Sequence, residues 1–322
     1  MPLPPTPSGL PFGAVMATGA ASALTGLVAL PALRSPLLAT AIVIALGVTG
    51  KGIAGLARVR GLRPRFGFGH FTVPVGLAVI ALGLTAGDAP GVTVVIAVWL
   101  TWATTALLLV VVVGPVAADR PGLRAVNGAW YIAPAALLAD AAGAGTLRPL
   151  CGPEWAAALD VMARACVWAG TAGYAALLIV GAVRIQRHGL HGAPRVAWWI
   201  VVGCGGLAAD VLGSLAGTLS EGTLAFTAVA CWAIATVVLV PVTVGSVVFL
   251  AGVRSLRGRP AWPPAFSSGV YALGTAQVGI LFPSLPVAPL AAVAAAETLV
   301  VWAATAALRV RGAVLARATI PR

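Results

Sequence analysis

The chain has 322 residues, of which 60% are hydrophobic and only 9% are charged, and its formal net charge is +12. A soluble domain carries about 25% charged residues, so this composition excludes a soluble protein and predicts an all-α polytopic membrane protein. Because a helix needs about 20 apolar residues to cross the hydrocarbon, residues 1–322 are expected to form a single transmembrane domain with about ten crossings.

The N-terminal segment, residues 1–13, has no basic region and no cleavage site, so we expect no signal peptide. Ten hydrophobic helices follow, separated by short breaks that carry turn residues or charge, such as Gly87-Asp-Ala-Pro-Gly91 and Pro283-Ser-Leu-Pro286. Their expected ranges are 10–32, 36–57, 70–87, 91–117, 128–146, 155–183, 194–218, 222–252, 263–284 and 286–309.

The basic residues predict the orientation in the membrane. If both termini lie on one side, that side holds sixteen of the 20 Lys and Arg residues, whereas the other side holds only Arg34 and Arg148. Cytoplasmic loops carry such an excess, so we expect a cell-membrane protein with both termini in the cytoplasm. The same bias explains the net charge of +12 without a nucleic-acid partner.

Odd-numbered and even-numbered helices differ in composition. The odd ones open with an aromatic residue near Pro or Gly and continue in small residues, whereas the even ones are richer in large aliphatic residues, as in the unbroken apolar run 107–113. The odd helices recur about every 60–70 residues, which suggests five copies of a helical hairpin. We therefore expect the odd helices to line a central pore and the even helices to face lipid.

The ninth helix opens with a segment rich in proline and small residues, Trp262-Pro-Pro-Ala-Phe266-Ser-Ser-Gly269. Prolines stand in its first turn, where a missing N–H costs little, and small residues then allow a neighbour to approach closely or leave space beside the helix. Phe266 is the one large aromatic side chain within residues 263–269, and we interpret it as the plug of the pore. The alternative is a kinked, closely packed transmembrane helix with one core aromatic residue.

Two of these helix openings resemble motifs of a known family. Phe12-Gly-Ala-Val-Met16-Ala-Thr-Gly19 and Phe266-Ser-Ser-Gly269-Val-Tyr-Ala-Leu-Gly-Thr275 are similar to segments of the tellurite-resistance/C4-dicarboxylate transporter (TDT) family, which includes the slow anion channels of plant guard cells. Weaker matches precede the third and fifth helices. The sequence departs from the family pattern at Ala17, which replaces Gly, and at Ser267, which replaces Pro.

The resemblance implies five hairpins in quasi-fivefold order around a central pore, with the phenylalanine at the position of Phe266 occluding it. It also implies a homotrimer in the lipid bilayer, with a separate pore in each subunit, and small inorganic anions or dicarboxylates as substrates. The other pore-lining candidates lie near the openings of the odd helices or on their small-residue faces. They are Phe12, Met16, Gly19, Pro74, Pro134, Gly203, Gly206, Gly269 and Gln277.

Charged residues within the helices are candidate functional groups, because charges inside a membrane are costly. Asp160 and Arg164 are four residues apart and can form an ion pair, although Arg164 could instead meet Asp140 or a substrate carboxylate. Asp140 and Asp210, on odd helices, could carry protons for coupled transport or be hydrated residues of an outer vestibule.

The helix pattern and the resemblance to the TDT family therefore predict an anion channel or facilitative carrier, not an enzyme. The alternative is a proton-coupled carrier of C4-dicarboxylates or of oxyanions such as sulfite or tellurite, and a more remote one is a membrane-embedded enzyme or haem protein. We expect no cofactor and no metal, because the four cysteines show no metal-ligand spacing and only His70 borders a helix.

Overall fold

The computed structural model describes residues 13–25, 27–58, 68–86, 91–113, 122–189, 195–219, 221–251 and 262–318. These residues form ten α-helices joined by turns, and no strand occurs among them. The helices are α1 (Gly13–Leu24), α2 (Arg34–Arg58), α3 (Thr72–Ala86), α4 (Gly91–Leu108), α6 (Ile132–Leu147), α7 (Pro153–His188), α8 (Trp199–Leu219), α9 (Gly222–Ala251), α10 (Trp262–Leu281) and α11 (Ala288–Ala318).

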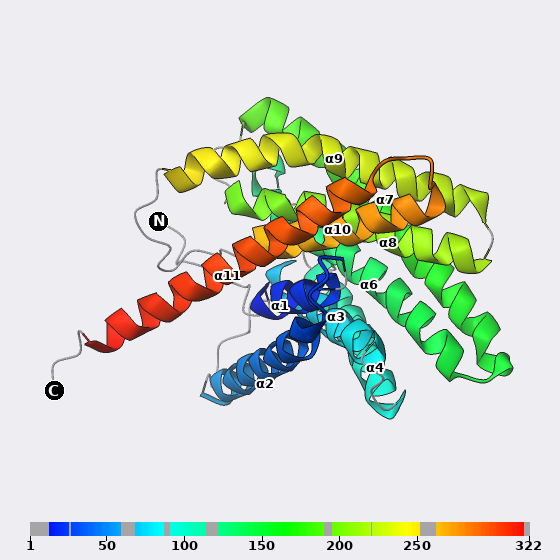
Figure 1. Cartoon of the computed structure of the whole chain (residues 1–322), viewed down its shortest axis with the longest axis horizontal. Helices are drawn as coiled ribbons and strands as arrows, with labels where there is room; N and C mark the ends of the chain where they lie inside the picture. Colours follow the sequence, from blue (N-terminus) through cyan, green and yellow to red (C-terminus); the bar gives the residue numbers. More distant parts are fainter. Residues whose placement is uncertain are drawn as a thin grey trace.

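Each observed helix overlaps one of the ranges expected from the sequence, and two ends show larger differences. Helix α1 ends at Leu24, well before residue 32, because a turn follows in which Leu30 N–H bonds to the Thr25 carbonyl and Pro31 opens a short 3₁₀-helix. Helix α11 continues to Ala318, beyond the expected end at 309, and its C-terminal part projects past the other helices (Figure 1).

Within the described residues, six helices are long and apolar enough to cross a membrane. Helices α1, α3 and α6 have 12, 15 and 16 residues in the described part of the chain, which is below the length of about 20 residues that spans the hydrocarbon. The six candidate spans are Pro31–Thr49, Gly91–Val113, Pro153–His188, Trp199–Leu219, Gly222–Val244 and Ala288–Leu308. The protein is therefore all-helical, with several helices suited to a membrane.

The helices pack as consecutive antiparallel hairpins. Each of α1, α3, α6, α8 and α10 packs closely against the helix that follows it in the chain. These five helices, called here the inner helices, also contact one another in a closed cycle: α1 with α3, α3 with α6, α6 with α8, α8 with α10, and α10 with α1. Helices α2, α4, α7, α9 and α11, the outer helices, lie around this cycle (Figure 1).

Burial separates the two sets. The apolar stretch of α8 is 83% buried, whereas the stretches of the five outer helices are only 17–33% buried. The outer helices expose large apolar side chains that would be unfavourable in water and that suit contact with lipid. Examples are Val43, Ile96, Trp155, Phe226, Val237, Val293 and Val300.

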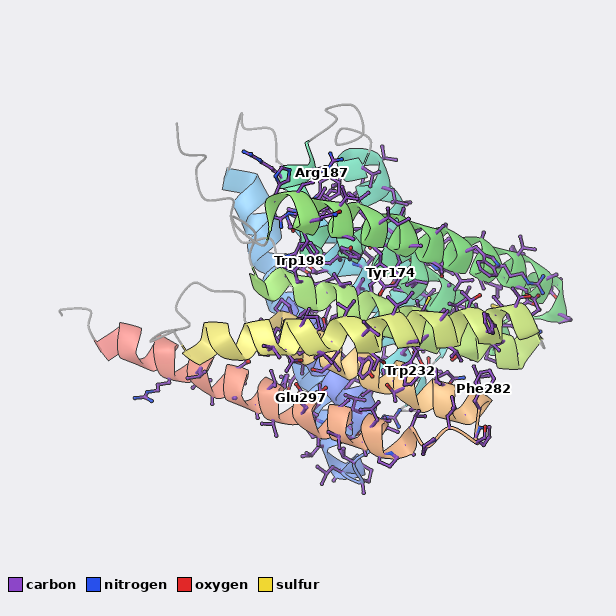
Figure 2. All side chains as sticks on the ribbon, turned by 90° about the horizontal axis from the view of Figure 1, so that it is seen from above. Tyr174, Arg187, Trp198, Trp232, Phe282 and Glu297 are labelled. Carbon is purple, nitrogen blue, oxygen red and sulfur yellow. The ribbon has the colours of Figure 1, made fainter. Side chains whose placement is uncertain are left out.

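Three outer helices are bonded to the inner helix of the next hairpin through a tryptophan indole N–H. In two of the three bonds the acceptor is a threonine hydroxyl that itself donates to the carbonyl four residues earlier in its helix, so the hydroxyl both donates and accepts. The bonds are Trp102 Nε1 to the Asp140 carbonyl at 3.1 Å, Trp232 Nε1 to Thr275 Oγ1 at 3.1 Å (Figure 2) and Trp302 Nε1 to Thr18 Oγ1 at 2.9 Å.

Removing one of these bonds is expected to weaken the junction between hairpins. Trp302→Phe keeps an aromatic ring but loses the donor to Thr18, which should lower the free energy of unfolding by about 0.5–1.5 kcal/mol. The measurement is thermal unfolding of the detergent-solubilised protein, with Trp155→Phe as the control because Trp155 is 62% exposed. Equal stability of the two variants would show that the Trp302 bond does not contribute.

Candidate pore between the inner helices

Two cavities lie between the inner helices, and each is lined by residues from all five of them. The smaller has a volume of about 10 Å³ and the larger about 40 Å³, which corresponds to about one water molecule and a few water molecules respectively. Within the described part of the chain, Phe266 is the one residue that lines both cavities. Its ring is 4% exposed, so this side chain stands between the two spaces.

The smaller cavity is surrounded by the N-terminal ends of the inner helices. A helix N-terminus carries a partial positive charge and unpaired N–H groups, which favour anions. The lining residues at these ends are Gly13 of α1, Thr72 of α3, Ile132 of α6, Ile200 of α8, and Trp262 and Pro263 of α10. First-turn residues of all five inner helices therefore line one small apolar space. Short 3₁₀-helices directly precede α3, α6 and α8, and the Ile132 N–H is bonded to the carbonyls of Ala129 and Trp130.

Phe266 is positioned by the unusual first turn of α10. Pro263 and Pro264 stand where a helix does not need their missing N–H groups, and Ser268 Oγ donates to the Pro264 carbonyl at 2.6 Å. Ser267, where the family pattern has Pro, is fully buried and lies against α8, because a Cβ on Gly203 would meet its Oγ at 2.8 Å.

The pore-lining candidates have three different outcomes. Met16 lines the smaller cavity together with Phe266, whereas Phe12 lies outside the described residues. The remaining candidates are absent from the linings of these two cavities. They were predicted because they lie near the openings of the odd helices or on their small-residue faces. They are Gly19, Pro74, Pro134, Gly203, Gly206, Gly269 and Gln277.

Most of these small residues serve close packing between helices. A Cβ on Gly206 would lie 2.6 Å from the Cα of Tyr271, and a Cβ on Gly269 would lie 3.0 Å from Ala20 and 3.1 Å from Thr298. Gly19 lies directly against Val79 of α3.

Pro134 and Gln277 likewise face neighbouring helices. A Cβ on Gly173 of α7 would lie 3.3 Å from the Pro134 ring, and a Cβ on Gly213 of α8 would lie 2.5 Å from the Gln277 side chain. None of the predicted glycines and prolines therefore lines either cavity, because a helix also needs small residues wherever a second helix approaches closely.

The two inner carboxylates have different surroundings. Asp210 of α8 lines the larger cavity. Asp140 of α6 is 5% exposed and accepts a hydrogen bond at 3.1 Å from Thr105 of α4, an outer helix. Both residues were candidates for proton coupling. Asp210 lines the space between the inner helices, whereas Asp140 is hydrogen-bonded to an outer helix and does not line that space.

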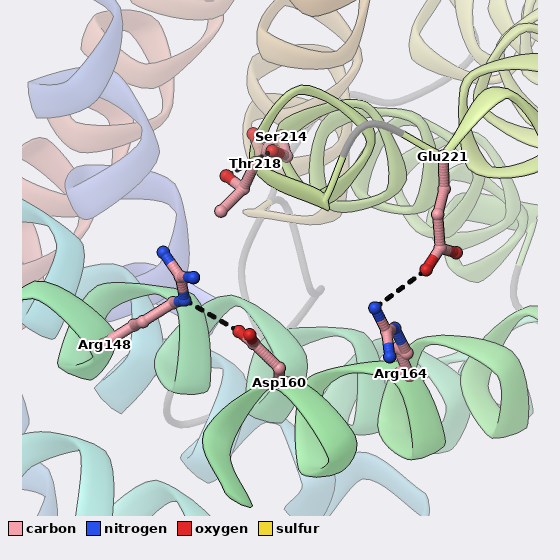
Figure 3. Close-up of polar contacts among 6 residues, drawn as sticks. All are labelled: Arg148, Asp160, Arg164, Ser214, Thr218 and Glu221. Atoms are coloured by element: carbon pink, nitrogen blue, oxygen red, sulfur yellow. Dashed lines mark hydrogen bonds and ion pairs between the residues drawn. The ribbon is translucent and has the colours of Figure 1, made fainter. Parts of the chain in front are cut away.

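The expected pair between Asp160 and Arg164 is wrong, because each binds a residue outside α7. Asp160 Oδ1 lies 2.8 Å from Nε of Arg148, and Arg164 Nη2 lies 2.8 Å from Oε1 of Glu221 (Figure 3). Their spacing allows an intrahelical pair, but α7 presents one side chain to the turn before it and the other to the segment that precedes α9. Both pairs are partly exposed and lie at one end of the bundle. The Arg148–Asp160 pair lies within the α6–α7 hairpin, whereas the Arg164–Glu221 pair joins this hairpin to the α8–α9 hairpin.

An aromatic cluster lies at the opposite end, in the 3₁₀ turns that precede α3, α6 and α8. Phe68 stacks on Trp130 with ring centroids 4.5 Å apart, and the Arg184 guanidinium lies 5.7 Å from the centroid of the Trp198 ring. Arg184 is 1% exposed. The aromatic openings of the odd helices were visible in the sequence, but the buried arginine among them was not expected, since it was assigned to the basic cytoplasmic loops.

Among the described residues, no group of three or more His, Cys, Asp or Glu side chains is arranged to hold a metal ion. The chain matches no protein-family profile and no curated protein.

Proposed function

We propose that this protein conducts small anions across the cell membrane through a passage between the inner helices, which Phe266 closes. In this proposal ten helices cross the membrane as five hairpins around the passage. The observation that carries it is the pair of cavities on the two sides of Phe266, each lined by all five inner helices. The resemblance of the α1 and α10 openings to the TDT family supports the same function and a homotrimer.

The proposed preference for anions rests on the helix N-termini around the smaller cavity. An apolar constriction selects poorly by itself, but helix dipoles at its entrance bias the sign of the ion without a tight binding site. A weak site is an advantage for conduction, since an ion must leave as readily as it enters. With both termini in the cytoplasm, as we propose from the distribution of arginines, these N-termini would lie at the cytoplasmic side and the larger cavity toward the outer side.

The test is the ion selectivity of the purified protein in planar bilayers, measured on Phe266→Ala so that the passage is open. Under a gradient of potassium chloride, the reversal potential should lie near the equilibrium potential of chloride. Replacing chloride by nitrate, malate or sulfite should shift it and thereby rank the permeant anions. A reversal potential near that of potassium, or no current from well-folded protein, would contradict the proposal.

A second candidate is a carrier that couples anion movement to protons, and the position of Asp210 at the larger cavity favours it. Such a carrier would accumulate an anion in vesicles against its gradient when a proton gradient is applied. A channel would only let the anion equilibrate.

A further inference from the structure

Among the described residues that line the larger cavity, Asp210 is the one that carries a charge. The other twelve lining residues are apolar, and they come from α1, α3, α6, α8 and α10. No basic side chain of the lining therefore offsets its charge. An ionised carboxylate here would place a negative charge beside the path proposed for an anion.

The titratable groups of the elements that contact α8 lie outside the lining of the larger cavity. Asp140 accepts a hydrogen bond from Thr105, and the Tyr271 hydroxyl bonds to Thr236 of α9 at 2.8 Å. The titratable and charged groups of these elements are Asp140 of α6, Tyr271 of α10, Cys231 of α9, Glu154, Asp160, Arg164, Cys166, Tyr174, Arg184, Arg187 and His188 of α7, Tyr131 of η5 (Gly128–Tyr131), and Arg195 of η7 (Arg195–Trp198) at the other end of α8. None of them lines the larger cavity.

A polar face of α8 leads from this cavity toward the end of the helix. Asp210, Ser214 and Thr218 follow one another at intervals of four residues, which places them on one face, and both Ser214 and Thr218 are exposed. A Cβ on Gly217, in the same turn, would meet no atom within 4 Å. Water and protons can therefore approach Asp210 along this face from the proposed outer side.

We propose that Asp210 makes anion permeation depend on the outer proton concentration. When its carboxyl group is protonated, the larger cavity is neutral and admits an anion. When it is ionised, like-charge repulsion in an apolar space of about 40 Å³ opposes entry. The inference rests on the proposed anion conduction and adds a specific site of regulation to it.

The experiment compares currents at a fixed anion gradient in the Phe266→Ala background, with outer pH of about 8 and then about 5. We expect acidification to raise the anion current about tenfold in this background. Adding Asp210→Asn should give a high current at both pH values, with a ratio below about twofold. Adding Asp210→Glu should restore the pH response, and Asp160→Asn should leave it intact, because Asp160 is paired with Arg148 away from the cavity.

Each result is decisive. A pH response that persists unchanged in Asp210→Asn would overturn the role of Asp210 while leaving anion conduction established. Anion accumulation against its gradient, driven by protons and lost in Asp210→Asn, would replace regulation by stoichiometric coupling. Absence of anion current in every variant, with normal folding, would contradict both this inference and the proposed function.

Discussion

Replacing Phe266 by alanine is expected to raise anion conductance by at least about tenfold, which corresponds to about 1.4 kcal/mol removed from the permeation barrier. The aromatic ring lines both cavities, so its removal should join them into one space. Side-chain size should then set the current: Phe266→Leu should fall between wild type and Phe266→Ala, and Phe266→Trp should conduct no more than wild type.

The measurement is the single-channel or macroscopic current in planar bilayers, normalised to the amount of correctly folded protein. Phe282→Ala is the matched control, because Phe282 follows α10 and lines neither cavity (Figure 2). If Phe266→Ala and Phe282→Ala change the current equally, Phe266 is a packing residue, as in the alternative interpretation of its sequence segment.

The second large effect concerns stability. Gly206→Ala is expected to lower the free energy of unfolding by about 3 kcal/mol and the unfolding temperature by about 6–12 °C. The added Cβ would lie 2.6 Å from Cα and 2.7 Å from N of Tyr271, and these are backbone atoms that cannot rotate away. The backbones of α8 and α10 would have to separate, and α10 carries Phe266.

Gly217→Ala is the control on the same helix, because a Cβ at this position meets no atom within 4 Å. It should leave the unfolding temperature unchanged or raise it slightly, since alanine favours a helix over glycine by up to about 1 kcal/mol. Thermal unfolding followed by size-exclusion chromatography would measure both variants. A fully stable Gly206→Ala protein would contradict the close approach of α8 and α10.

The two helices of a hairpin could be distinguished from the sequence because they meet different surroundings. A helix such as α9 exposes Phe226 and Val237, and its large aliphatic residues suit lipid. The inner α8 packs on several neighbours, which requires glycines such as Gly203 and Gly206. Composition therefore predicted which helices are buried.

The partners of individual polar residues could not be predicted in this way. Asp160 and Arg164 have the correct spacing for a pair within α7, yet they bind Arg148 and Glu221. Sequence spacing predicts which residues are neighbours on one helix. These partners come from other segments, and the number of residues between two segments does not predict how close they lie in the folded protein. The same limit applies to Trp302, whose bond to Thr18 joins residues near opposite ends of the chain.

By itself, the sequence determined the class of this protein, because hydrophobicity, charge distribution and helix period are properties of each segment. It predicted an all-helical protein whose helices suit a membrane. It also predicted that helices rich in small residues alternate with helices rich in large aliphatic residues, and it identified Phe266 as a large side chain among small ones. Only the tertiary structure decided that Phe266 separates two cavities, that Asp210 lines one of them while Asp140 does not, and that most small residues are used for packing. These facts depend on which helix faces approach one another, and that is a property of the assembled bundle.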